Sequence, residues 1–69
     1  MNETPIVNSL LEEIENDRKS LTQFFKGPFT ILRIVNDSVI AKTNIGMYKI
    51  YFKYDDTNKK ERLILEKIK

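Results

Sequence analysis

The side chains best suited to bind a ligand lie in the alternating stretch MYKIYFKY near the middle of the sequence. Successive side chains of a strand point to opposite faces, so Lys49, Tyr51 and Lys53 are expected to share one face. Single-stranded nucleic-acid sites combine cations for phosphates with aromatic rings for bases. Arg33 and Lys42 are candidates to lie beside this stripe. A solvent-exposed strand shows the same pattern, because Lys keeps it soluble and Tyr favours strands.

Catalysis and metal binding find little support in the residue types. The chain contains no Cys and no His, which removes thiolate chemistry, the commonest general base and the commonest transition-metal ligand. The adjacent carboxylates of Glu12 and Glu13 point apart on a helix, and those of Asp55 and Asp56 suit a turn. The two glycines form no phosphate-cradling loop. We therefore expect no enzyme activity, no catalytic residue, no metal and no cofactor.

Charge is unevenly distributed along the chain. The first 25 residues contain five acids and two bases, a net charge of −3, whereas the remaining 44 contain ten bases and five acids, a net charge of +5. An acidic surface can dock on a basic partner. Glu12, Glu13 and Glu15, with the aromatic Phe25, are therefore the candidates for a protein-partner face. A solvated helix surface would have the same composition.

The N-terminal part of the chain, about residues 5–26, is expected to be helical. Apolar residues recur at helical spacing and form one stripe: Val7, Leu10, Leu11, Ile14, Leu21, Phe24 and Phe25. Asp17 and Arg18 interrupt this stripe, and Ser20 with Gln23 fits a second helix start. The segment is therefore either one long helix or two helices broken near 16–20, and Gly27-Pro28 ends it in both cases.

The remainder, about residues 29–68, is expected to form four strands at 29–35, 39–43, 47–54 and 61–68. β-branched and aromatic residues fill these segments, and short polar turns separate them. Short connections favour antiparallel pairing of consecutive strands. The predicted fold class is α+β: an N-terminal helix, intact or broken, packed on a four-stranded antiparallel meander or small half-barrel. The helix should cover the sheet face that carries Tyr48, Ile50 and Phe52.

The first and last strands carry apolar residues in both phases, so the second face of the sheet is also partly apolar. Either the sheet curls into a small barrel, or this face packs on something, such as another copy of the chain. Ile64 and Ile68 are the candidate dimer residues. A core of this size rarely supplies more than about 3–5 kcal/mol, which also favours association with a partner.

Length and composition describe one domain, residues 1–69, with 41% hydrophobic and 32% charged residues. No apolar run approaches the roughly 18 residues of a membrane span, and no signal-peptide pattern opens the sequence. We therefore expect no membrane association and a cytoplasmic location.

These observations favour a small non-catalytic binding protein, a regulator or inhibitor that docks on a protein partner. The high content of Ile, Lys and Asn, whose codons are AT-rich, fits an accessory protein of a phage or mobile element. One alternative is a nucleic-acid-binding module that uses the basic and aromatic sheet face. A second alternative is a structural homodimer.

Overall fold

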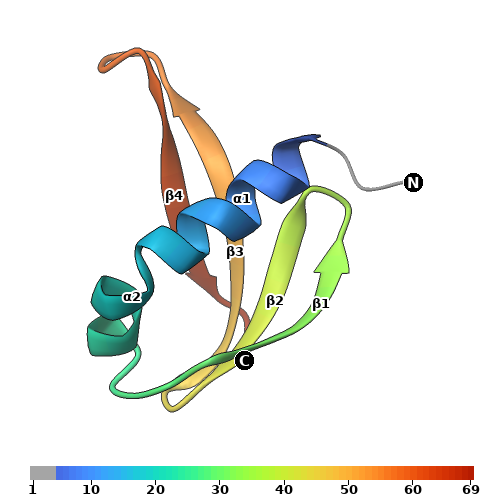
Figure 1. Ribbon diagram of the computed structural model, residues 1–69, viewed down its shortest axis with the longest axis vertical. Helices are drawn as coiled ribbons and strands as arrows, with labels where there is room; N and C mark the ends of the chain where they lie inside the picture. Colours follow the sequence, from blue (N-terminus) through green and yellow to red (C-terminus); the bar gives the residue numbers. More distant parts are fainter. Residues whose placement is uncertain (1–4) are drawn as a thin grey trace.

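The computed structural model describes residues 5–69, which form two short helices packed on a four-stranded antiparallel sheet (Figure 1). The elements in chain order are α1 (Pro5–Asn16), α2 (Arg18–Phe24), β1 (Thr30–Val35), β2 (Ser38–Thr43), β3 (Gly46–Asp55) and β4 (Lys60–Lys67). The strands lie in the order β1-β2-β3-β4. The predicted α+β fold with an antiparallel meander is confirmed, and the sheet is open rather than closed into a barrel.

The helical stripe faces the sheet and supplies one side of the core. Val7, Leu10, Ile14, Leu21 and Phe25 are all buried. The helix breaks at Asp17, inside the predicted interval, where a carboxylate takes the place of the next apolar side chain of the stripe. Backbone hydrogen bonding continues across the break: the Asp17 N–H donates to the Glu13 carbonyl, and the Leu21 N–H donates to the Asp17 carbonyl, both at 2.9 Å. The break is therefore a change of direction and not a loop.

The carboxyl groups of Glu13 and Asp17 lie one helical turn apart at this break. A side-chain hydrogen bond with Asp17 raises the pKa of Glu13, and the negative charge of Asp17 adds to the shift. A carboxyl whose pKa is raised in the folded state stabilises the fold when it is protonated. That contribution is lost as the pH rises through the folded-state pKa of Glu13.

Replacing Glu13 with glutamine is therefore expected to raise the free energy of unfolding at about pH 7. The gain should be about 0.2–0.5 kcal/mol, the usual size of a like-charge repulsion one turn apart on a helix surface. Urea unfolding at about pH 7 and about pH 4 measures it. The advantage of Glu13→Gln should shrink at the lower pH, where the wild-type carboxyl is protonated. An equal advantage at both pH values would contradict this explanation.

The sheet presents its more apolar side to the helices. The core cluster unites Leu10, Ile14, Leu21, Phe25 and Phe29 with the strand residues Val39, Ala41, Tyr48 and Ile50. Phe52, Leu63 and Leu65 pack at its margin. The prediction that the helices cover the face of Tyr48, Ile50 and Phe52 is thus confirmed.

The first strand contains an irregularity that the sequence pattern did not indicate. The pairing of β1 with β2 shifts between Ile31, opposite Ala41, and Arg33, opposite Ile40. Leu32 is the extra residue of this β-bulge, in which two residues of one strand oppose one of the other. After the shift, Ile34 lies opposite Val39, so Ile31 and Ile34 point to the same side of the sheet. The bulge explains why this strand carries apolar residues in both phases.

The end of α2 is tied to the turn between β2 and β3. Lys26 and Gly27 both have positive φ values, 65° and 146°, which turn the chain back towards the sheet. The side-chain amide of Asn44 donates a 2.8 Å hydrogen bond to the Lys26 carbonyl. A Cβ atom on Gly27 would collide with that amide. The hydrogen bond from Asn44 therefore links the end of the helical layer to the β2–β3 turn.

Candidate nucleic-acid interface

The side of the sheet opposite the helices, called here the outer face, collects all five residues that the sequence indicated for nucleic-acid binding. Lys49, Tyr51 and Lys53 alternate along β3 with the buried side of that strand. Lys42 lies opposite Met47, and Arg33 opposite Ile40, which is itself opposite Lys49. Paired residues of neighbouring antiparallel strands point to the same face. The register therefore places Arg33, Lys42, Lys49, Tyr51 and Lys53 on one surface.

The outer face is strongly basic. Its register positions carry six cations (Arg33, Lys42, Lys49, Lys53, Lys60 and Arg62) and two acids (Asp55 and Glu66), a net charge of +4. The two helices with Asp17 carry four acids and two bases, a net charge of −2. The fold thus separates positive and negative charge onto opposite sides of a two-layer molecule. A field of this kind attracts polyanions to the sheet side.

Lys60, Arg62 and Glu66 are functional candidates that sequence reasoning missed. Arg62 is opposite Lys53, and Glu66 is opposite Lys49. Their place on the outer face depends on the register of β3 with β4, and the turn of residues 56–59 does not fix that register by its composition. The sequence of the last strand alone did not determine which of its alternating residues lie on which face of the sheet.

Tyr51 occupies the centre of this face, where its ring is half-buried. The Lys49 ammonium lies 5.5 Å from the centroid of the Tyr51 ring, which is a cation–π distance. Partial removal of the hydroxyl from water raises the pKa of Tyr51, and the charge and hydrogen bond of Glu66 raise it further. Tyr51 is therefore protonated at neutral pH and held between Lys49 and Glu66. A base that stacked on this ring would displace or accompany the Lys49 ammonium.

The candidate dimer residues lie on the same outer face. Ile64 is half-buried opposite Tyr51. The Ile68 N–H donates to the Met47 carbonyl at 2.8 Å, which extends the pairing beyond β4 and places Ile68 beside Met47. Ile68 is 46% exposed. The nucleic-acid and dimer interpretations therefore concern overlapping parts of one surface.

Only some of the residues proposed for a protein-partner face on the helices are exposed. Glu12 and Glu15 are exposed and Glu13 is half-buried. Glu15 is held by Arg18 in an ion pair of 3.0 Å. Phe25 was wrongly assigned to this face, because its side chain is 0% exposed and lies in the core.

Phe24 is the aromatic residue that α2 presents to solvent. It is 51% exposed, although its ring also makes edge contacts with Phe25 at 5.3 Å and Tyr48 at 6.1 Å between centroids. Adjacent helical residues point about 100° apart, so only one of the two rings can enter the core. The spacing in the sequence did not determine which one.

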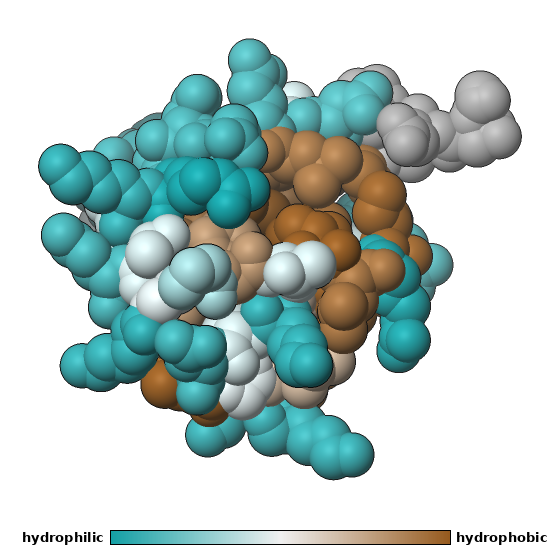
Figure 2. All heavy atoms as spheres, turned by 60° about the horizontal axis from the view of Figure 1, so that its bottom comes forward, coloured by the Kyte–Doolittle hydropathy of each residue, from teal (hydrophilic) through white to brown (hydrophobic). Residues whose placement is uncertain are grey.

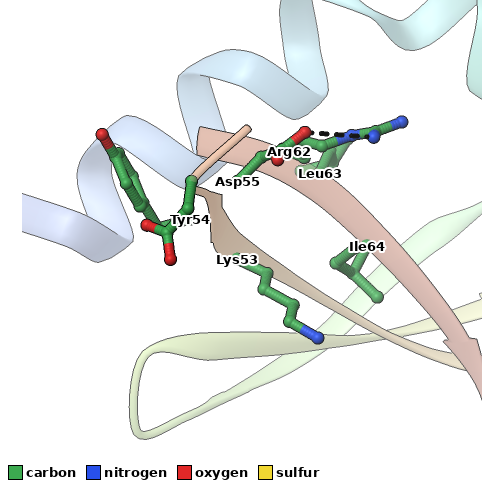
Figure 3. Close-up of a pocket in the computed structure, with 7 residues that line it drawn as sticks. Lys53, Tyr54, Asp55, Arg62, Leu63 and Ile64 are labelled. Atoms are coloured by element: carbon green, nitrogen blue, oxygen red, sulfur yellow. Dashed lines mark hydrogen bonds and ion pairs between the residues drawn. The ribbon is translucent and has the colours of Figure 1, made fainter. Parts of the chain in front are cut away.

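A shallow hollow of about 340 Å³ lies at the far end of the β3–β4 hairpin. Figure 3 shows Lys53 and Ile64 projecting to one side of the hairpin, away from the helices, while Arg62 turns to Asp55. The Asp55 carboxylate accepts hydrogen bonds from the Asn58 side-chain amide at 2.7 Å and from the Thr57 N–H at 2.9 Å. The Asn58 side chain is the main cause that lowers the pKa of Asp55. This acid stabilises the turn and stays charged.

Comparison of the chain with protein-family models, with curated proteins and with solved structures finds no match. Within residues 5–69, no helix is long and apolar enough to cross a membrane. In the same part of the chain, no group of three or more acidic, His or Cys side chains could hold a metal ion.

Proposed function

We propose that this chain is a non-catalytic binding protein whose outer face binds single-stranded nucleic acid. The observation that carries the proposal is the presence of six cations on the sheet face that carries Tyr51, the side without helices. Lys and Arg contacts to phosphates supply most of the affinity of such sites, and they tolerate any sequence. The ring of Tyr51 adds a surface on which one base can stack.

The geometry favours an unpaired strand over a duplex. The outer face is a sheet surface, and helices that could enter a major groove lie on the acidic side of the molecule. Lys49 and Lys53 are four residues apart, which corresponds to about 13 Å along an extended strand. Adjacent strands add about 4.8 Å each across the sheet. A face of this size covers on the order of four nucleotides, the lower end of the range for small β-sheet folds.

Fluorescence anisotropy of labelled mixed-sequence oligonucleotides, single- and double-stranded DNA and RNA, tests the proposal. Binding should occur at micromolar protein and should weaken as salt rises from about 50 to about 200 mM, because the release of counterions that drives binding is less favourable at higher salt. Three or four phosphate contacts give a logarithmic salt slope of about −2 to −3 for a single strand. No binding at the lower salt, or equal binding of duplex and single strand, would contradict the proposal.

A regulator or inhibitor that docks on a protein is the second candidate. The exposed Phe24 favours it, since a large aromatic side chain on the helical layer that also carries the exposed acids Glu12 and Glu15 could anchor a basic partner. Phe24 takes the role that the sequence assigned to Phe25. Under this proposal, Phe24→Ala should weaken capture of the partner, whereas charge changes on the outer face should leave it unaltered.

A further inference from the structure

The two edges of the open sheet differ in their chemistry. β4 carries both signs of charge along its length, with Lys60, Glu61, Arg62, Glu66 and Lys67. Charges on an edge strand oppose pairing with another chain. The opposite edge, β1, has the sequence TILRIV, in which Arg33 is the single charge. Charged residues therefore protect the β4 edge, whereas β1 carries one charge and the bulge at Leu32 as its protection.

The β1 edge also exposes apolar side chains. Leu32, Ile34 and Val35 are exposed, and so is Ile6 at the start of α1, which lies towards the same side of the molecule. Figure 2 shows the hydrophobic surface gathered on that side. A monomeric protein rarely leaves an apolar patch next to unpaired backbone groups of a strand.

We propose that the β1 edge pairs with the β1 edge of a second copy, in antiparallel orientation about a two-fold axis at Ile34. Antiparallel partners must share a face of the sheet. Centring the pair on Ile34 sets Ile34 against its own copy on the helix side and Arg33 against Val35 on the outer face. Centring it on Arg33 would set two guanidinium groups directly opposite each other, which is destabilising. The bulge at Leu32 lies outside the regular part of this pairing.

A second copy fits this edge because the edge is complementary to itself. The strand has no acid to receive a basic partner and a single cation to receive an acidic one. In a two-fold symmetric contact, both copies contribute the same exposed apolar side chains to the interface. The regular pairing is short, so Ile6, Leu32 and Ile34 would carry most of the contact, which implies a dimer of modest strength.

The edge-to-edge dimer would also strengthen nucleic-acid binding, an inference that rests on the proposed function. Joining the sheets edge to edge places the two outer faces side by side. Arg33 of each copy, at the joined edge, would bridge the two basic surfaces. One single strand could then cross both, and binding in both halves raises the overall affinity through effective concentration.

Sedimentation velocity of the full chain at about 5–200 µM measures the association. We expect a concentration-dependent mass that approaches twice 8.2 kDa. Leu32→Lys and Ile34→Lys should each return it to the monomer mass. Ile68→Lys is the matched control, because Ile68 is 46% exposed, comparable to Ile34 at 42%, but lies by the other edge. Circular dichroism checks that each variant is folded. If Ile34→Lys is unfolded, the test depends on Leu32→Lys alone.

Two results of these sedimentation experiments would overturn the proposal. A wild-type monomer at about 200 µM overturns the proposal, and so does a dimer that Ile68→Lys dissociates while Leu32→Lys and Ile34→Lys do not. The latter result would support the sequence-based dimer residues Ile64 and Ile68. Salt distinguishes this proposal from the nucleic-acid proposal: screening of two basic faces should strengthen the β1 dimer, whereas it weakens oligonucleotide binding.

Discussion

Replacing Phe25 with alanine is expected to unfold the protein at room temperature. Phe25 is 0% exposed and packs against Phe29 and Tyr48, with ring centroids 5.3 and 5.0 Å away. Truncation of a buried phenylalanine costs about 3–5 kcal/mol, because it removes buried apolar surface and leaves a cavity. The core of a domain of this length rarely supplies more than about 3–5 kcal/mol of stability. The change therefore removes most or all of the stability, which thermal and urea unfolding followed by circular dichroism will measure.

Phe24→Ala is the matched control for this prediction. It deletes the same side chain from the neighbouring position, but Phe24 is half-exposed and contributes mainly edge contacts to Phe25 and Tyr48. Aromatic pairs of this kind contribute about 0.5–1.5 kcal/mol. The protein should remain folded with a lower midpoint. Equal decreases in stability from the two substitutions would show that the assignment of Phe25 to the core and Phe24 to the surface is wrong.

Reversing the charge of Lys49 and Lys53 together is expected to abolish oligonucleotide binding in the range where the wild type binds. Both lysines project from β3 on the outer face, on either side of Tyr51. The double variant replaces two attractions to phosphates with two repulsions and lowers the net charge of that face from +4 to 0. We expect the affinity to fall by more than about tenfold. Neutral glutamines at the same positions should reduce the salt slope by about 0.7 for each phosphate that is no longer neutralised.

The control for charge reversal keeps the overall change in charge but moves it off the outer face. Lys19 lies on α2, and Lys67 lies opposite Tyr48 on the helix side of the sheet. The double variant Lys19→Glu/Lys67→Glu has the same net charge as the Lys49→Glu/Lys53→Glu variant. It should retain most of the binding, apart from a general weakening at low salt. Similar decreases in affinity for the two variants would mean that net charge, and not this surface, attracts the oligonucleotide.

The order and type of the elements followed from periodicity in the sequence. The strict alternation around Tyr51 determined which residues of β3 share a face, and Asp17 marked the helix break by standing where an apolar residue was due. Both patterns are local, because they depend on the geometry of one element. That is why the α+β architecture and the placement of Lys49 with Lys53 were predictable.

Features that depend on contacts between elements were not predictable in this way. The bulge at Leu32 reverses the faces of half a strand, and only pairing with β2 reveals it. The contribution of Arg62 and Glu66 to the outer face depends on the register across the β3–β4 turn. Phe24 and Phe25 have the same side chain and adjacent positions, so the choice between them depends on the angle at which α2 crosses the sheet.

The central claim, that the outer face is the binding surface, is tested most directly by ¹⁵N NMR titration of the labelled protein with a short single-stranded oligonucleotide. The amides of Arg33, Lys42, Lys49, Tyr51 and Lys53 should shift together with increasing ligand, while those of Glu12, Glu15 and Phe24 stay in place. Shifts confined to the helices, or none at concentrations where anisotropy reports binding, would contradict the account.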